Sequence, residues 1–92
     1  MTTKMQEYAN VATLVAGVAR LDEALRPTAA TPEAKIAAEF DGIEKVVTAL
    51  PLATDEYCFA MNWIAGARNC WRAGQLGAAR YQLAMVRKKL AR

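Results

Sequence analysis

Four segments of this 92-residue chain carry apolar residues at alternating spacings of three and four. That spacing places apolar side chains on one face of an α-helix, whereas a half-buried strand would need a spacing of two. The segments cover residues 3–25, 32–50, 55–73 and 77–91. The pattern therefore predicts an all-α fold built from four helices over these ranges.

The same spacing predicts the core. The larger members of the apolar rows are Val11, Leu14, Val18, Leu21, Leu25, Ile36, Phe40, Ile43, Val47, Leu50, Leu76, Leu83, Val86 and Leu90. The segment 55–73 carries two adjacent rows. They are Phe59, Trp63, Gly66, Cys70 and Ala73 in one, and Ala60, Ile64, Ala67 and Trp71 in the other. Because such a wide apolar arc is typical of a buried helix, we expect this third helix to be central in the fold.

Local signals mark the ends of the helices. Thr31 is a suitable N-cap before Pro32, which favours the first helical position. Pro51 cannot continue the second helix, and Gly74 can adopt the left-handed conformation that ends the third. We expect Gly77 to cap the fourth helix, with Leu76 and Tyr81 forming a hydrophobic staple. Gly17, inside the first helix, is interpreted as a position of close helix contact.

The joints between the predicted helices are short, and short joints favour antiparallel neighbours. We therefore expect a single helical domain over 1–92, arranged as a small antiparallel bundle. A chain of this length buries only about 60–65% of its unfolded surface, so a second copy would add to its core. The first helix offers a second row of small residues for such contact, and we expect a homodimer or higher homo-oligomer. The expected self-association residues are Ala9, Ala12, Ala16 and Ala19.

Two cysteines, Cys58 and Cys70, lie twelve residues apart in the predicted third helix. Their separation along the helix axis is about 18 Å, whereas a disulfide needs Cα atoms closer than about 7 Å. We expect two separate buried thiols in a cytoplasmic protein. The longest uncharged runs, 8–19 and 57–67, are shorter than the roughly 20 residues needed to span a bilayer, so no membrane contact is expected.

The residues that usually carry catalysis are missing from this sequence. It contains no histidine, which excludes the usual Ser or Cys triads and most zinc sites. The segment from Gly74 to Gly77 lacks the length and the Lys-Ser/Thr ending of a phosphate-binding loop. We therefore expect no enzymatic activity, no cofactor and no metal.

Charge is distributed unevenly along the chain. Residues 1–56 contain all nine acidic residues and five cations, whereas residues 57–92 contain seven cations and no acid. Cations in the last turn of a helix interact favourably with its dipole, which accounts for part of this excess. The dipole does not account for Arg68, Arg72 and Arg80, which we expect on the outer side of the last two helices. A functional basic surface is expected there.

Trp63, Trp71, Tyr57 and Tyr81 are interspersed with these cations, and Trp and Arg are frequent anchors of protein interfaces. The first hypothesis is a non-catalytic regulator or inhibitor that docks its basic helical hairpin on an acidic surface of a larger protein. The predicted contact residues are Arg68, Arg72, Trp71, Arg80, Tyr81, Arg87 and Lys88. The alternatives are a nucleic-acid or nucleotide binder that uses the same hairpin, and a structural self-assembly subunit.

Overall fold

The computed structural model describes residues 4–90, with side chains described from residue 11 onward. It contains four α-helices: α1 (Lys4–Ala24), α2 (Glu33–Ala49), α3 (Thr54–Arg72) and α4 (Leu76–Leu90), and no strand within the described range. The predicted all-α class with four helices is confirmed. Each helix end lies within one residue of its predicted position, although positions 3 and 91 themselves lie outside the described residues.

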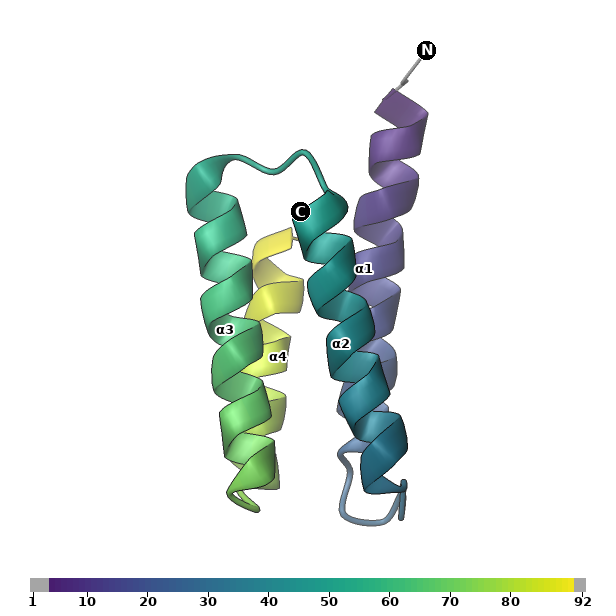
Figure 1. Cartoon of the computed structure of the whole chain (residues 1–92), viewed down its shortest axis with the longest axis vertical. Helices are drawn as coiled ribbons and strands as arrows, with labels where there is room; N and C mark the ends of the chain where they lie inside the picture. The colour runs from purple at the N-terminus through teal and green to yellow at the C-terminus, as the bar shows by residue number, and fades with distance from the viewer. Residues whose placement is uncertain (1–3, 91–92) are drawn as a thin grey trace.

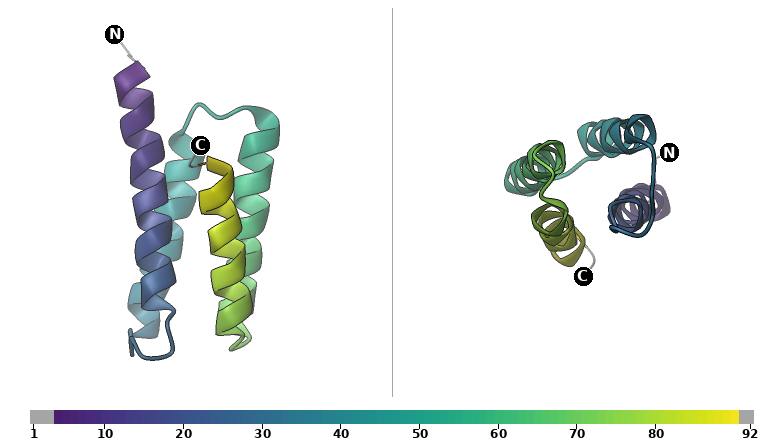
Figure 2. Two further views of the ribbon diagram at one scale, coloured as in Figure 1. Left: turned by 180° about the vertical axis from the view of Figure 1, so that it is seen from behind. Right: turned by 90° about the horizontal axis from the view of Figure 1, so that it is seen from below.

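The helices form an antiparallel ring (Figures 1 and 2). Helix α1 lies beside α2 and α4, and α3 also lies beside α2 and α4, whereas the backbones of the diagonal pairs do not approach closely within 4–90. The bundle measures 42 × 21 × 20 Å, and the end-on view in Figure 2 shows one helix at each corner. The expectation that α3 is central is therefore wrong, because every helix in the ring has two neighbours and one outward face.

The core runs along the axis of this ring. Its buried side chains are Leu14, Val18, Leu21, Leu25, Ile36, Phe40, Ile43, Val47, Leu50, Ala60, Ile64, Ala67, Ala79, Leu83 and Val86. The predicted rows of α1, α2 and α4 supply most of this set. Only one of the two rows of α3 is buried, because Phe59, Trp63 and Cys70 of the other row lie half-buried at the contact with α4.

A hydrogen-bonded glycine turn ends α3. Gly74 has φ +78°, and its N–H donates to the carbonyl of Trp71 at 3.0 Å. The next N–H, that of Gln75, donates to the carbonyl of Cys70 at 2.8 Å. These two bonds make a Schellman motif, which satisfies carbonyls that the helix leaves free. The predicted left-handed conformation of Gly74 is confirmed.

The other end signals were less accurate. Helix α2 begins at Glu33, and the capping position belongs to Pro32 rather than Thr31, with no side-chain hydrogen bond. Instead, the carbonyl of Pro32 accepts hydrogen bonds from the N–H groups of Lys35 and Ile36. Helix α4 already begins at Leu76, so Gly77 lies inside its first turn and the expected cap at Gly77 is wrong.

Gly17 is buried where α1 and α2 pack together. A Cβ atom at this position would lie 2.9 Å from Cγ2 of Ile43. The absence of a side chain therefore permits the observed approach of the two helices, as the sequence predicted. None of the helices within the described range is long and apolar enough to cross a membrane.

Candidate functional site

Arg68 of α3 is held against α2, at the contact between these two helices. Its guanidinium donates to Oδ1 of Asp41 at 2.8 Å and to Oε1 of Glu44 at 3.0 Å, and its side chain is only 17% exposed. The guanidinium carbon also lies 5.6 Å from the centre of the Phe40 ring. The hydrogen bond to Asp41 is the main cause that raises the pKa of Arg68 above its ordinary value. The expected position of Arg68 on the outer side of α3 is therefore wrong.

Arg80 joins α4 to α1, the last helix of the chain to the first. Its Nε donates to Oδ1 of Asp22 in α1 at 2.9 Å, and this bond raises the pKa of the guanidinium. Trp71 is also engaged internally, because its ring stacks on the core residue Phe40 with centroids 5.6 Å apart. These three predicted contact residues, Arg68, Arg80 and Trp71, thus join helices to one another.

Three of the predicted contact cations remain available. Arg72, Arg87 and Lys88 are exposed, and none of them forms an ion pair with any residue of the described range. Arg72 lies in the last turn of α3, whereas Arg87 and Lys88 lie in the last turn of α4. The basic surplus of the sequence is therefore concentrated at the C-terminal ends of these two helices.

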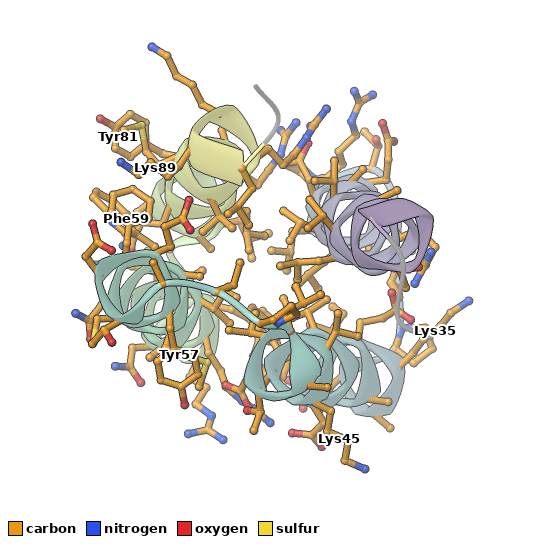
Figure 3. The ribbon with its side chains drawn as sticks, turned by 90° about the horizontal axis from the view of Figure 1, so that it is seen from above. Lys35, Lys45, Tyr57, Phe59, Tyr81 and Lys89 are labelled. Atoms are coloured by element: carbon orange, nitrogen blue, oxygen red, sulfur yellow. The ribbon has the colours of Figure 1, made fainter. Side chains whose placement is uncertain are left out.

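An aromatic cluster covers the outer contact between α3 and α4. The ring of Trp63 lies 5.8 Å from that of Phe59 and 6.4 Å from that of Tyr81, measured between centroids. The ammonium of Lys89 lies 5.5 Å from the centre of the Phe59 ring. Figure 3 shows Phe59, Tyr81 and Lys89 together on the outside of the two helices. We call Phe59, Trp63, Tyr81 and Lys89 the aromatic patch.

Helical spacing explains why these side chains meet. Phe59 and Trp63 are four residues apart on α3, and Tyr81 and Lys89 are eight apart on α4, so each pair lies on one face of its helix. Tyr81 is 62% exposed, although its ring makes an edge-to-face contact with that of Trp63. The rings therefore order one another at the surface instead of entering the core.

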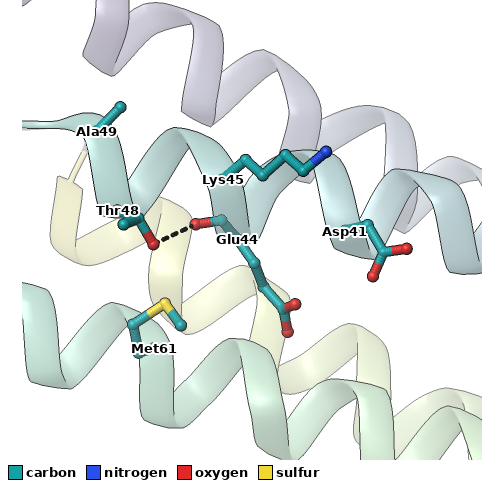
Figure 4. Close-up of a pocket in the computed structure, with 6 residues that line it drawn as sticks. All are labelled: Asp41, Glu44, Lys45, Thr48, Ala49 and Met61. Atoms are coloured by element: carbon teal, nitrogen blue, oxygen red, sulfur yellow. Dashed lines mark hydrogen bonds between the residues drawn. The ribbon is translucent and has the colours of Figure 1, made fainter.

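A hollow lies between α2 and α3 (Figure 4). Its lining comprises Asp41, Glu44, Lys45, Thr48, Ala49 and Met61. Both carboxylates are engaged with Arg68, and the hydroxyl of Thr48 donates to the carbonyl of Glu44 within its own helix at 2.9 Å. The hollow is open and brings no nucleophile and base together. No group of three potential metal ligands occurs within the part of the chain that the structure describes.

The two cysteines are free, as expected, but Cys58 is exposed rather than buried. Cys70 is half-buried, and its Sγ accepts a hydrogen bond from Nε2 of Gln82 at 3.1 Å. The predicted burial of both thiols is therefore wrong. Phe59 faces α4. Cys58 is the preceding residue, so its side chain leaves the helix in a different direction and is exposed.

The predicted self-association row lies largely on the surface. Ala12 and Ala16 are exposed and Ala19 is half-buried, while the side chain of Ala9 lies outside the described residues. The row remains available for contact with another molecule, and self-association stays a prediction.

Sequence reasoning placed Tyr81 correctly among the surface residues but assigned Phe59 and Trp63 to the core and omitted Lys89. The available signal was the width of the apolar arc of the third helix, which exceeds what a helix with two neighbours can bury. No known protein family matches this chain, and no curated protein or solved structure shows significant similarity to it.

Proposed function

We propose that this protein is a non-catalytic protein-binding module, acting as a regulator or inhibitor, that docks the outer face of α3 and α4 on an acidic surface of a larger protein. The observation that carries this proposal is the aromatic patch, in which Tyr81 is 62% exposed although its ring contacts that of Trp63. Ordered and exposed aromatic side chains are typical of interface anchors.

The internal contacts of the patch would lower the cost of binding. Aromatic side chains have few rotatable bonds, so contact with a partner costs little conformational entropy. The tilted contact of Phe59 with Trp63 and the edge-to-face contact of Trp63 with Tyr81 reduce this cost further. Lys89 supplies the cation of the patch, since its ammonium lies over the Phe59 ring. A partner surface with carboxylates around an apolar centre would complement this arrangement.

A nucleic-acid ligand is the second candidate. Single-stranded nucleic acid stacks its bases on exposed aromatic rings beside cations, and the patch offers both. A protein partner is favoured because internal carboxylates already neutralise Arg68 and Arg80. Four described cations of the hairpin, Arg72, Arg87, Lys88 and Lys89, are left for phosphates.

Site-specific crosslinking tests the proposed surface. A photoreactive phenylalanine analogue would replace Tyr81, and a control chain would carry the analogue at Lys35, which is exposed on α2 away from the patch (Figure 3). In the source cell, we expect one discrete protein adduct from position 81 and none from position 35. The purified partner should then bind the Tyr81→Ala variant about 30-fold more weakly than the native chain, as for an interface anchor. Equal adducts at both positions would contradict the proposal.

A titration with generic single- and double-stranded nucleic acid separates the second candidate. If about four phosphates of a single strand were bound, affinity would fall about 50-fold between about 50 and 200 mM salt. Binding with that salt dependence, lost in Tyr81→Ala, would establish the nucleic-acid function instead.

A further inference from the structure

We infer that the aromatic patch binds an amphipathic helix of the partner, whose apolar face ends in a carboxylate that pairs with Lys89. This inference rests on the proposed function of the patch and names the element that would occupy it. Three features of the patch carry it: its length, its few hydrogen-bonding groups and the cation at one of its ends.

The patch is a row of side chains that follows α3 and α4 lengthwise. Tyr81 contacts Trp63, and Trp63 contacts Phe59. The ammonium of Lys89 lies over the Phe59 ring at the far end of the row. Tyr81 and Lys89 are eight residues apart on α4, so the row is about 12 Å long, and the half-buried Met85 lies midway on the same face. A little more than two turns of a bound helix have this length, and its side chains three and four residues apart would meet the successive rings.

The patch offers few groups that could bind the backbone of a partner. Besides the ammonium, its hydrogen-bonding groups are the hydroxyl of Tyr81 and the indole N–H of Trp63. An extended segment laid over the rings would bury some of its own N–H and C=O groups against apolar carbon, which costs free energy. A helix satisfies these groups internally and presents only side chains. The patch therefore favours a helix over a strand as its occupant.

Charge distinguishes the two ends of the row. At one end, Lys89 is exposed and forms no ion pair with a residue of the described range. Its contact with Phe59 uses only the face of the ring, so its N–H donors can still bind a carboxylate. At the other end, Arg80 precedes Tyr81 in the chain, but its Nε donates to Asp22 of α1. A carboxylate of the partner is therefore attracted to the Lys89 end of the row, which sets the direction of the bound helix.

Selection from displayed peptide libraries tests the inference. One library would present peptides of about 18 residues, long enough to form a helix, with random apolar residues at positions i and i+4 and any residue at i+8. A matched library would carry a proline in the middle of each peptide, which breaks the helix. Against the native chain, we expect enrichment of the helical library alone, with Glu or Asp at i+8. Against the Lys89→Glu variant, the same position should be enriched in Lys or Arg.

Binding of single peptides would quantify the charge preference. A selected acidic peptide should bind the native chain about fivefold more tightly than its counterpart with Lys at i+8, and Lys89→Glu should invert this preference. The control Lys35→Glu removes an exposed cation away from the patch and should leave the preference unchanged (Figure 3). In nuclear magnetic resonance, the indole N–H signal of Trp63 should shift on binding, whereas that of Trp71, which stacks on Phe40, should shift much less. Circular dichroism would verify the helical content of each variant.

The inference is overturned if neither library is enriched, if the proline library is enriched equally, or if Lys89→Glu does not invert the preference at i+8. Crosslinking from position 81 tests the proposed function separately, because it assumes no particular form of the partner. A discrete protein adduct at position 81 without a helix-dependent selection would reject the helical occupant and leave the proposed function standing. Absence of both would reject the two together.

Discussion

At the scale of single residues, Phe40 lies where three interactions meet. Its side chain is fully buried, its ring stacks on Trp71, and the guanidinium of Arg68 lies over it. The same guanidinium pairs with Asp41 and Glu44 of α2. The apolar and the ionic contacts between α2 and α3 therefore lie side by side. The contact between α2 and α3 is thereby concentrated around this ring.

Replacement of Phe40 by Ala should lower the free energy of unfolding by about 3–5 kcal/mol, because it removes buried surface and leaves a cavity under Trp71 and Arg68. Chemical denaturation would measure the change. Tyr81→Ala serves as the control, since that side chain is mainly exposed and its loss should cost less than about 1 kcal/mol. Similar losses for the two variants would show that Phe40 is not a core residue.

The ion pairs show what could not be predicted from the sequence. Arg68 lies 27 residues from Asp41 and 24 from Glu44, and Arg80 lies 58 residues from Asp22. Such pairs depend on which helices are adjacent and on how each is shifted and rotated along its axis. Apolar spacing predicts the buried face of one helix but fixes neither of these relations. The cations could therefore be counted, but their partners could not be assigned.

At the scale of the elements, helix positions were predictable because each depends on a local pattern. Alternating spacing located all four helices, and Gly74 marked the end of α3. The prediction that α3 is the central helix was wrong, since its wide apolar arc faces both the core and the surface beside α4. The width of this arc indicated that some of its apolar residues would stay at the surface. The sequence did not show which of the two rows of α3 these would be.

Two glycines should respond in opposite ways to substitution by Ala. Gly74 has φ +78°, so Gly74→Ala should cost about 1 kcal/mol of the free energy of unfolding. Gly42 lies inside α2, where a Cβ atom would meet nothing within 4 Å, so Gly42→Ala should add about 0.5–1 kcal/mol. Thermal unfolding of both variants checks the signs. A stabilising Gly74→Ala would contradict the observed turn.

At the scale of the whole molecule, the separation of charge along the sequence is partly neutralised by the antiparallel ring. Asp41 and Glu44 of the acidic half bind Arg68 of the basic half, and Asp22 binds Arg80. The described cations of the basic half that form no ion pair lie in the last turns of two helices: Arg72 in α3, and Arg87, Lys88 and Lys89 in α4. The proposed binding patch includes Lys89 of the latter turn.

The hairpin of α3 and α4 should not fold alone, although it carries the proposed binding patch. Its buried residues, among them Ile64 and Leu83, belong to the common core of the four helices. A peptide covering 54–90 is also shorter than the roughly 40 residues that usually suffice without a disulfide or metal. Circular dichroism should therefore show much less helix per residue for this peptide than for the full chain. A fully helical, cooperatively melting peptide would contradict this expectation.

The ring also has a consequence for the order in which the chain folds. Three of its four helix contacts join elements that follow one another in the chain, and only α1 with α4 closes a long loop. Folds with mostly local contacts reach their native state in microseconds to milliseconds, and the loop-closing contact is the one that costs the most chain entropy. The meeting of α1 and α4, secured by Asp22 and Arg80, is thus expected to be the late step, and the ring closes around its core only once this contact has formed.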